Sequence, residues 1–306
     1  MRVGVVDLGT NSTRLVVADV DADRVDEVSR HTVITRLGEG VDERRKLLPL
    51  PVARVRNALS DYRRELEELG AERVLAIGTS AIRDAENGEA FLGEIEWSYG
   101  FATRLLSGDE EAELTRRGVA NGRAVDDDTL VLDVGGGSTE LITAAERTSI
   151  DVGSVRLTER HLRSDPPTRE ELEAAAQTVR DELPPLDPRD AIGVAGTITT
   201  LAALELGGYD LERVHRHRLT REAVDSLLAR LASLPLDERR ELPGLEPERA
   251  PVIVGGAIVV REVLERYGLD GLEASERDLL HGAAVEAAAL PAVEEGDAPP
   301  GAYTCC

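Results

Sequence analysis

The sequence predicts an α/β protein built from two similar domains. At 306 residues, the chain is longer than a single hydrophobic core usually serves. Apolar segments of strand length alternate with longer segments of helical periodicity, which is typical of α/β proteins. One local plan occurs twice, at residues 5–13 and 132–139: an apolar strand that ends in Asp, a turn with glycine and hydroxyl side chains, and a second strand. A repeat at this separation predicts two related domains.

The repeated turn is most pronounced at residues 131–141, where three glycines follow the strand. Glycines at a strand end allow backbone N–H groups to approach a ligand closely, and successive N–H groups form a concave anion site. Asp133 and Glu140 flank the turn, as carboxylates would beside a divalent cation. A tight hairpin would use the same residue types. The second copy at residues 5–13 favours phosphate binding, because two such hairpins would otherwise have to coincide.

The remaining elements follow from periodicity and from stop signals. Strands are predicted at residues 2–7, 13–20, 25–37, 73–78, 101–106, 147–157 and 191–194. Helices are predicted at residues 51–69, 168–182, 221–234, 251–267 and 275–290, and also after Thr79 and Ser107. Residues 38–51 read as irregular, and the polar segment at residues 121–128 as a domain junction. Gly70 is the expected stop of the first long helix, and Thr168 with Glu171 forms an expected capping box.

The amino-acid composition limits the classes of partner that the protein is expected to bind. The net charge of −23 repels nucleic acid and anionic membranes, so neither is expected to bind. Lys46 is the only lysine, and an acidic, lysine-poor composition suggests an acidic, halophilic-type protein of a high-salt cytoplasm. The two cysteines, Cys305 and Cys306, cannot build a disulfide framework, which fits a reducing cytoplasm. No apolar run reaches membrane-spanning length, and the first strand lacks a signal-peptide core.

An arginine and an acidic segment of the first domain are candidate functional residues. Arg83 follows the strand at residues 73–78, close to the edge where ligands of open α/β sheets bind. An anion contact is favoured there over a solvated helix charge. The acidic residues at 109–113 open a helix, and in isolation they would be ordinary partners of the helix dipole.

Five motifs occur in an order that resembles a known family. They are Asp7-Leu8-Gly9-Thr10-Asn11-Ser12, Thr79-Ser80-Ala81-Ile82-Arg83-Asp84, Ser107-Gly108-Asp109-Glu110-Glu111-Ala112, Asp133-Val134-Gly135-Gly136-Gly137-Ser138-Thr139-Glu140 and Gly153-Ser154-Val155-Arg156-Leu157. Together they resemble the exopolyphosphatase and guanosine pentaphosphate phosphohydrolase (Ppx/GppA) family, in its short form. The resemblance covers about residues 2–290 and implies two RNase H-like domains of the actin-like, sugar kinase and Hsp70 fold, with a cleft between them.

The resemblance also implies domain limits. The N-terminal domain would run over residues 1–120, with the last helix at about residues 275–290 packing back on it. The C-terminal domain would run over residues 121–274. Residues 291–306 would be a disordered acidic tail.

The activity implied by the resemblance is hydrolysis of a terminal phosphoanhydride bond with the help of Mg²⁺ or Mn²⁺. Glu111 would be the catalytic glutamate, with Glu110 as the fallback, and Arg83 would contact the phosphates. The phosphate-binding residues would come from both turns: Gly9, Thr10, Asn11, Ser12, Arg14, Gly135, Gly136, Gly137, Ser138 and Thr139. The metal would be held by Asp7, Asp133 and Glu140.

Several substrates remain open. The first interpretation is an exopolyphosphatase that releases orthophosphate from polyphosphate ends, with a homodimer forming a long groove and an arginine strip such as Arg14, Arg83 and Arg156 contacting the chain. The second is removal of the 5′ terminal phosphate of pppGpp, and the third is an ATP-dependent kinase or ATPase of the same fold. Two departures from the family pattern, at Pro251 and at Leu280-His281, make contacts between the second domain and substrate uncertain.

Overall fold

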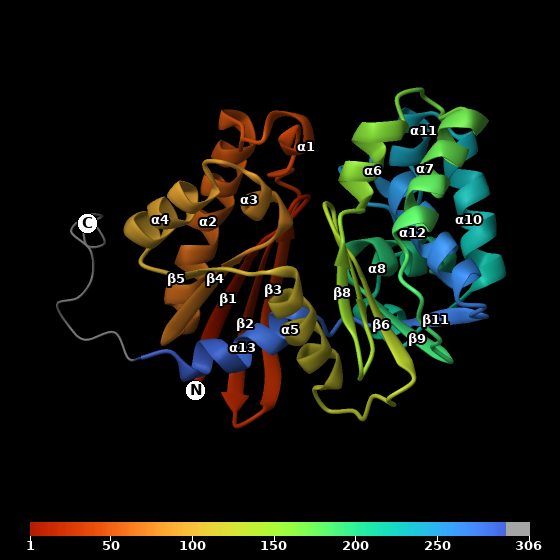
Figure 1. Ribbon diagram of the computed structural model, residues 1–306. Coiled ribbons are helices and arrows are strands. Elements are labelled where there is room, and N and C mark those ends of the chain that lie inside the picture. The colour runs from red at the N-terminus through yellow and green to blue at the C-terminus, as the bar shows by residue number, and fades with distance from the viewer. Residues whose placement is uncertain (292–306) are drawn as a thin grey trace. The chain divides into compact units, whose positions relative to one another are not determined.

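The computed structural model of the chain describes residues 1–291. These residues form two compact units: unit 1 contains residues 1–123 and the helix that begins at Leu279, and unit 2 contains residues 124–278. Each unit combines a β-sheet with helices (Figure 1). The acidic tail that the sequence predicts over residues 291–306, and its two cysteines, lie outside the described residues apart from Pro291.

Unit 1 is built on a five-stranded sheet with the order β3-β2-β1-β4-β5 (Figure 1). Its strands are β1 (Arg2–Leu8), β2 (Thr13–Asp21), β3 (Arg24–Val33), β4 (Arg73–Gly78) and β5 (Ala102–Leu105). Its helices are α1 (Val41–Arg44), α2 (Pro49–Leu69), α3 (Ser80–Asp84), α4 (Gly88–Tyr99), α5 (Gly108–Ala120) and α13 (Leu279–Ala289). β1 is the centre, antiparallel to β2 and parallel to β4.

The alternation of side chains along β1 assigns each residue to a face of the sheet. Val6 and Leu8 belong to the core that includes residues of α2 and α4, whereas Val3 and Val5 belong to the core shared with α5 and α13. Asp7 has the parity of Val3 and Val5. Its carboxylate therefore lies on the α5 side of the sheet, at the carboxyl end of the central strand.

Unit 2 is built on a six-stranded sheet with the order β10-β11-β9-β6-β7-β8. Its strands are β6 (Thr129–Val134), β7 (Thr139–Ile142), β8 (Arg147–Ile150), β9 (Asp190–Val194), β10 (Arg218–Thr220) and β11 (Gly271–Ala274). Its helices are α6 (Ser154–His161), α7 (Arg169–Glu182), α8 (Ala195–Leu206), α9 (Leu211–Val214), α10 (Arg221–Ser233), α11 (Leu236–Arg240) and α12 (Ile253–Arg266).

The two sheets share one topology. In each, a central strand carries an antiparallel hairpin on one side and parallel strands on the other: β1 with β2-β3 and β4-β5, and β6 with β7-β8 and β9-β11. The short strand β10 adds an antiparallel edge in unit 2. This arrangement confirms the predicted α/β class with two RNase H-like domains. The cleft expected between them concerns the placement of the units and stays a prediction.

Local signals placed several helix ends correctly. Gly70 caps α2 with a left-handed φ of 71°. Ser107 is the N-cap of α5 and Thr168 that of α7, and each forms a capping box with the glutamate three residues later. The helix predicted after Ser107 therefore begins where expected.

The predicted strand over residues 147–157 is wrong in its second half. β8 ends at Ile150, and α6 begins at Ser154. The cause is tertiary contact, because Gly153 packs so tightly on the glycine turn that a Cβ would lie 2.5 Å from the carbonyl carbon and oxygen of Gly136. The following N–H groups then bond to the turn rather than to a strand.

Other boundaries also differ. The last helix begins at Leu279 rather than at residue 275, because the N–H of Ser275 bonds to the carbonyl of Gly193 and so continues the sheet. α12 begins at Ile253, two residues after Pro251. The segment expected to be irregular contains α1, and α4 and β10 were not predicted. Within residues 1–291, no helix is long and apolar enough to span a membrane.

Candidate active site

Loop 1, residues 9–12, joins β1 to β2 and has its carbonyl groups engaged by the protein. The carbonyl of Thr10 accepts the N–H of Gly38 at 2.8 Å. The carbonyl of Asn11 accepts the N–H of Arg36 at 2.9 Å. These bonds orient the peptide groups of the loop, so that their N–H groups are available on the other side.

The N–H groups of loop 1 confirm this orientation. Gly9 donates to the carbonyl of Ser12 at 3.0 Å and closes the turn. The N–H groups of Thr10, Asn11 and Ser12 have no acceptor within residues 1–291. The Asn11 side chain is 7% exposed, and its buried Oδ1 atom also lacks a hydrogen-bond partner within that part of the chain. Polar groups in this state indicate a ligand or ordered water.

Loop 2, residues 135–138, joins β6 to β7 and repeats the arrangement with different support. The carbonyl of Gly135 accepts the N–H of Ser154 at 2.9 Å. The carbonyl of Gly136 accepts the N–H of Val155 at 2.8 Å. The first turn of α6 thus holds the carbonyl groups of loop 2, using N–H groups that have no partner inside a helix.

The N–H groups of loop 2 follow the same pattern as those of loop 1. Gly135 donates to the carbonyl of Ser138 at 3.1 Å, as Gly9 does in loop 1. Within the described chain, the N–H groups of Gly136, Gly137 and Ser138 have no acceptor. Three successive N–H donors at the carboxyl end of a central strand can bind one phosphoryl group. Both predicted phosphate turns therefore have N–H groups without an acceptor among the described residues, and phosphate binding by them stays a prediction.

The acidic residue before each loop has a different neighbour. In unit 1, Asp7 is the register partner of Arg14, and its Oδ2 accepts Nε at 2.9 Å and Nη2 at 2.8 Å. In unit 2, Asp133 is the register partner of Glu140. Asp133 is 5% and Glu140 is 1% exposed. Opposed side chains of antiparallel strands lie close together, so unit 2 buries two carboxylates side by side.

A third side chain fixes Glu140. Ser149 on β8 is its register partner on the other side, and the Ser149 hydroxyl donates to Glu140 Oε1 at 2.8 Å. Ser149 was not singled out from the sequence; its signal was only the alternation of a short strand. Thr139, expected to bind phosphate, is fully buried, and its hydroxyl donates to the carbonyl of Val152 at 2.6 Å. This bond ties β7 to the start of α6.

The donor set of unit 2 suits a hard cation. Within the described residues, no group of three or more His, Cys, Asp or Glu side chains could enclose a metal ion by itself. Mg²⁺ does not need such a cage, because it is commonly held by one or two carboxylates, waters and substrate phosphates. Asp133 and Glu140 fit that pattern. Asp7 fits it less well, because Arg14 already supplies a positive charge to its carboxylate.

Glu111 lies in the first turn of α5 and is 7% exposed. Arg83 on α3 approaches it, with Nη1 at 3.4 Å from Glu111 Oε2. The same nitrogen donates to the carbonyl of Leu106 at 2.8 Å. The structure therefore brings the two predicted catalytic residues together, and Arg83 also clamps the segment that leads from β5 into α5.

The adjacent Glu110 has a different environment. Its Oε2 accepts the N–H and the hydroxyl of Ser107, each at 2.8 Å, and its Oε1 accepts Nη2 of Arg104 at 2.5 Å. These bonds, the one from the Ser107 backbone foremost, lower the pKa of Glu110 to about 2. A carboxylate so occupied is a poor proton acceptor, which favours Glu111 over Glu110 as the base.

The two departures from the family pattern occupy different units. Arg249, beside Pro251, places its guanidinium against Gly196 at the start of α8 in unit 2. His281 belongs to α13 in unit 1, where Nε2 lies 3.4 Å from Glu27 Oε2. Burial raises the pKa of Glu27, but hydrogen bonds from His281 and Arg30 outweigh burial and hold it below its ordinary value. The second departure therefore affects unit 1, not the second domain as expected.

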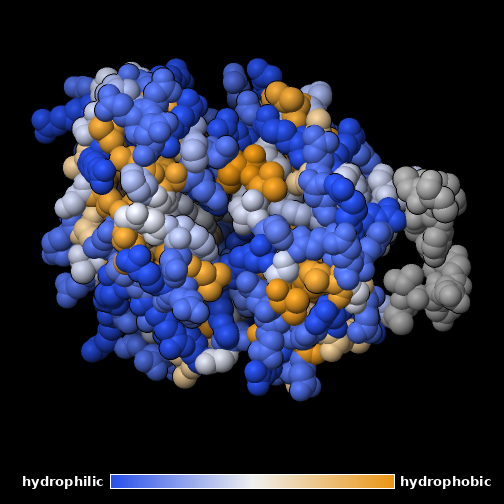
Figure 2. Space-filling view, turned by 180° about the vertical axis from the view of Figure 1, so that it is seen from behind, coloured by the Kyte–Doolittle hydropathy of each residue, from blue (hydrophilic) through white to orange (hydrophobic). Residues whose placement is uncertain are grey.

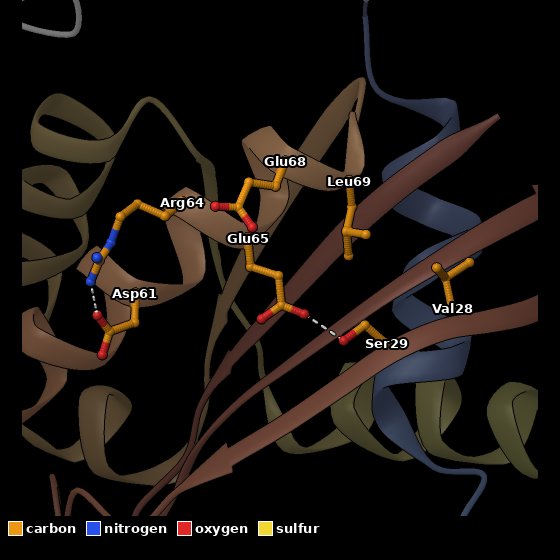
Figure 3. A pocket seen from close by; sticks show the side chains of 7 residues that line it. All are labelled: Val28, Ser29, Asp61, Arg64, Glu65, Glu68 and Leu69. Atoms are coloured by element: carbon orange, nitrogen blue, oxygen red, sulfur yellow. Dashed lines mark hydrogen bonds and ion pairs between the residues drawn. The ribbon is translucent and has the colours of Figure 1, made fainter. Parts of the chain in front are cut away.

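One surface cavity is unrelated to the loops. It measures about 510 Å³ and lies between β3 and α2 of unit 1. Figure 3 shows Arg64 turned toward Asp61 and Glu65 turned toward Ser29, with Glu68 beside them. This acidic lining repels phosphate. The face of the molecule drawn in Figure 2 is also mainly hydrophilic, with small separate hydrophobic patches.

Comparison with known proteins decides the family. Residues 16–289 match the Ppx/GppA phosphatase family. The chain belongs to the Ppx/GppA phosphatase family. It is 40% identical over 314 residues to exopolyphosphatase 2 of Mycobacterium tuberculosis strain H37Rv, covering 94% of this chain and 98% of that protein. The crystal structure of an exopolyphosphatase-like protein superposes with a TM-score of 0.86 at 33% identity, covering 94% of this chain and 98% of the other.

A further relative is named for a different activity. The guanosine-5′-triphosphate,3′-diphosphate pyrophosphatase of Photobacterium profundum is 28% identical over 287 residues, which are 87% of this chain but 55% of that protein. Membership of the family confirms the predicted resemblance and the prediction of an enzyme that hydrolyses phosphoanhydride bonds. The roles of individual residues stay predictions.

Proposed function

We propose that this protein is an exopolyphosphatase that hydrolyses the terminal phosphoanhydride bond of inorganic polyphosphate and releases orthophosphate. The observation that carries the proposal is the pair of loops, each with three successive N–H groups that have no acceptor among residues 1–291. Such donors suit a substrate that consists of phosphates alone. The relative from M. tuberculosis, which matches over nearly its whole length and is named an exopolyphosphatase, supports this substrate class.

In this proposal the loops bind and orient phosphoryl groups. The N–H groups of Thr10, Asn11 and Ser12 bind oxygens in unit 1, and those of Gly136, Gly137 and Ser138 do so in unit 2. Because these donors are fixed by bonds to the loop carbonyls, they stabilise the negative charge of the transition state without reorganising. Arg14 and Thr139 support the loops through Asp7 and the Val152 carbonyl.

Glu111 acts as the base of the hydrolysis. Its carboxylate accepts a proton from a water molecule, the water oxygen bonds to the terminal phosphorus, and the bridging P–O bond breaks. The products are orthophosphate and a polyphosphate one unit shorter. Arg83 holds Glu111 and presents its remaining guanidinium nitrogens to the phosphates.

Asp133 and Glu140 hold Mg²⁺, or Mn²⁺, as a cofactor. When bound, the ion neutralises phosphate charge and so makes the phosphorus more electrophilic. The protein's part is to keep two carboxylates together, which the register of β6 and β7 and the Ser149 hydroxyl achieve. A net charge of −23 makes this cation important, since polyphosphate is itself strongly anionic.

The second candidate is a pppGpp 5′-phosphohydrolase, supported by the relative from P. profundum. Its terminal phosphates would use the same loops. A kinase or ATPase of the same fold is disfavoured, because Glu111 with Arg83 matches the hydrolase pattern. ATP-dependent phosphorylation of a sugar would reverse that judgement.

The test compares phosphate release from long-chain polyphosphate and from pppGpp, in Mg²⁺ and at high KCl. We expect a higher kcat/KM for polyphosphate, and a preference for pppGpp would overturn the substrate assignment. Glu111→Gln should abolish turnover and leave polyphosphate binding intact, because the amide cannot accept the proton. Glu113→Gln is the matched control: this residue is half-buried on the same helix, its Oε1 lies 3.9 Å from Nη2 of Arg117, and the variant should behave as wild type.

Two further properties belong to the proposal. A homodimer would lengthen the surface along which polyphosphate binds, and sedimentation with and without substrate tests it. The acidic, lysine-poor surface suits a high-salt cytoplasm, where ions screen its self-repulsion. The melting temperature should then rise from low salt to molar KCl, and a salt-independent melting curve would refute this adaptation.

A further inference from the structure

The proposed base, Glu111, lies on a helix whose first turn takes part in a series of ion pairs. Glu111 follows Glu110, which closes the capping box of α5 with Ser107. Glu110 Oε1 accepts Nη2 of Arg104 at 2.5 Å. Arg104 lies on β5, three residues before the cap. The charge pair therefore links β5 to the first turn of α5.

The ion pairs continue from Arg104 to the last helix, α13. The other terminal nitrogen of Arg104 donates to Glu286 Oε2 at 2.5 Å. Glu286 belongs to α13, and its other oxygen lies 3.9 Å from Nη1 of Arg117 on α5. One carboxylate of α13 thus contacts both β5 and α5, and Leu280 and Leu114 also pack the two helices together in a common core.

We infer that Glu286 and Arg104 are positioning residues for Glu111: through the Glu110 cap they fix the first turn of α5, and so the place from which Glu111 reaches its water. The inference rests on the proposed role of Glu111. Arg83 also binds this junction, through the Leu106 carbonyl and the Glu111 carboxylate. Two arginines, Arg83 and Arg104, therefore bind the junction, which a helix placed only by packing would not require.

The sequence contains no sign of this role. Residues 104 and 286 are 182 positions apart, and Glu286 lies in a helix whose apolar residues alone drew attention. Neither residue belongs to the motifs that carry the family resemblance.

The experiment removes the charge of Glu286 and leaves the catalytic residues untouched. In Glu286→Gln we expect kcat for polyphosphate to fall about tenfold with KM within twofold, because small displacements of a catalytic group are costly. Glu286→Asp should recover most of the rate. The matched control is Glu94→Gln, which breaks the equally short pair between Glu94 Oε1 and Arg56 Nε, at 2.6 Å and between α2 and α4. It should lower stability similarly without changing kcat.

A second measurement makes the inference independent of the substrate. Hydrogen exchange of the amides in residues 108–113 should be faster in Glu286→Gln than in the wild type and in Glu94→Gln. Unchanged exchange together with an unchanged kcat would overturn the positioning role, as would an equal loss of kcat in both variants. A wild-type enzyme that releases no phosphate would refute the proposed function instead, and faster exchange would still show that Glu286 fixes α5.

Discussion

Loop 1 and loop 2 present the same N–H groups but are held in different ways. In loop 1 the carbonyls of Thr10 and Asn11 are bonded by the irregular segment after β3. In loop 2 the carbonyls of Gly135 and Gly136 are bonded by the first turn of α6. The same peptide orientation therefore arises from two unrelated supports, which shows that the orientation, rather than its support, is the common feature.

The charges beside the loops differ as well. The strand that follows loop 1 places Arg14 opposite Asp7, whereas the strand that follows loop 2 places Glu140 opposite Asp133. A carboxylate beside a guanidinium is neutralised, but two neighbouring carboxylates favour a cation. In the proposed mechanism this difference corresponds to separate roles, in which unit 2 holds the metal and unit 1 holds the base.

The largest expected effect breaks this division directly. Glu140→Gln should lower turnover by about 10³-fold or more and weaken Mg²⁺ binding, because one of two charged ligands is lost. Asp7→Asn should leave Mg²⁺ affinity close to wild type, although it removes the negative charge that Asp7 places beside Arg14. Mg²⁺ titration by calorimetry and by activity measures both. Equal losses of Mg²⁺ affinity in the two variants would mean that both units hold the ion.

A backbone substitution tests the support of loop 2. Gly153→Ala would place a Cβ 2.5 Å from the carbonyl of Gly136, and backbone atoms cannot move aside as a side chain can. We expect a loss of about 2–4 kcal/mol in unfolding free energy and a marked loss of activity. Gly93→Ala is the control, since a Cβ at this exposed position of α4 meets nothing within 4 Å. It should be neutral or slightly stabilising, and thermal denaturation compares the two.

Much of this comparison could be predicted from the sequence. The repeated strand, Asp, glycine turn and hydroxyls are local features, so both loops, their strands and the two-sheet fold followed from them. The capping boxes at Ser107 and Thr168 are equally local and were located correctly. Arg83 and Glu111 were also predicted from the sequence, and the structure places Arg83 Nη1 at 3.4 Å from Glu111 Oε2.

What could not be predicted depends on contacts between distant residues. α6 was read as strand, because nothing in residues 153–157 reveals that their N–H groups bond to loop 2. The register that puts Arg14 beside Asp7 but Glu140 beside Asp133 was present in the sequence and was overlooked. Asp7 was therefore grouped with the metal ligands, although its neighbour differs. The link from Glu286 to Arg104 had no local signal at all.

A milder substitution tests the support of loop 1. In Gly38→Ala the new Cβ would lie 2.2 Å from Cγ2 of Thr10 and 3.3 Å from the Cβ of Ala81. Because the nearest atom is a side-chain methyl group, rotation or a small shift relieves part of the clash. We expect a loss of about 1–2 kcal/mol and a smaller fall in activity than in Gly153→Ala. A larger loss would show that loop 1 is the more rigid of the two.

The smallest expected effect concerns a carboxylate of unit 1 that is paired with an arginine. Bonds from Ser107 and Arg104 lower the pKa of Glu110 to about 2, below the ordinary 4.5. A carboxylate whose pKa falls on folding stabilises the folded state above its unfolded pKa, and this contribution disappears as the pH falls toward the folded pKa. The stability lost in Glu110→Gln should therefore be greatest above about pH 5 and vanish near pH 2.

Because the Glu110 carboxylate is partly exposed, its effect should stay below about 1 kcal/mol. Glu171→Gln is the matched control in unit 2. In the capping box of α7, this glutamate accepts from Thr168, Ser164 and the Arg163 backbone, and no arginine side chain of the described residues donates to it. The stability lost in Glu171→Gln should also decrease as the pH falls. It should respond less to added KCl than the loss in Glu110→Gln, because salt screens the Arg104 contact of Glu110. Urea denaturation across pH at two KCl concentrations separates the two. If the two variants respond equally to salt, the arginine beside Glu110 makes no measurable difference. The two units would then differ in charge only at the strands beside the loops.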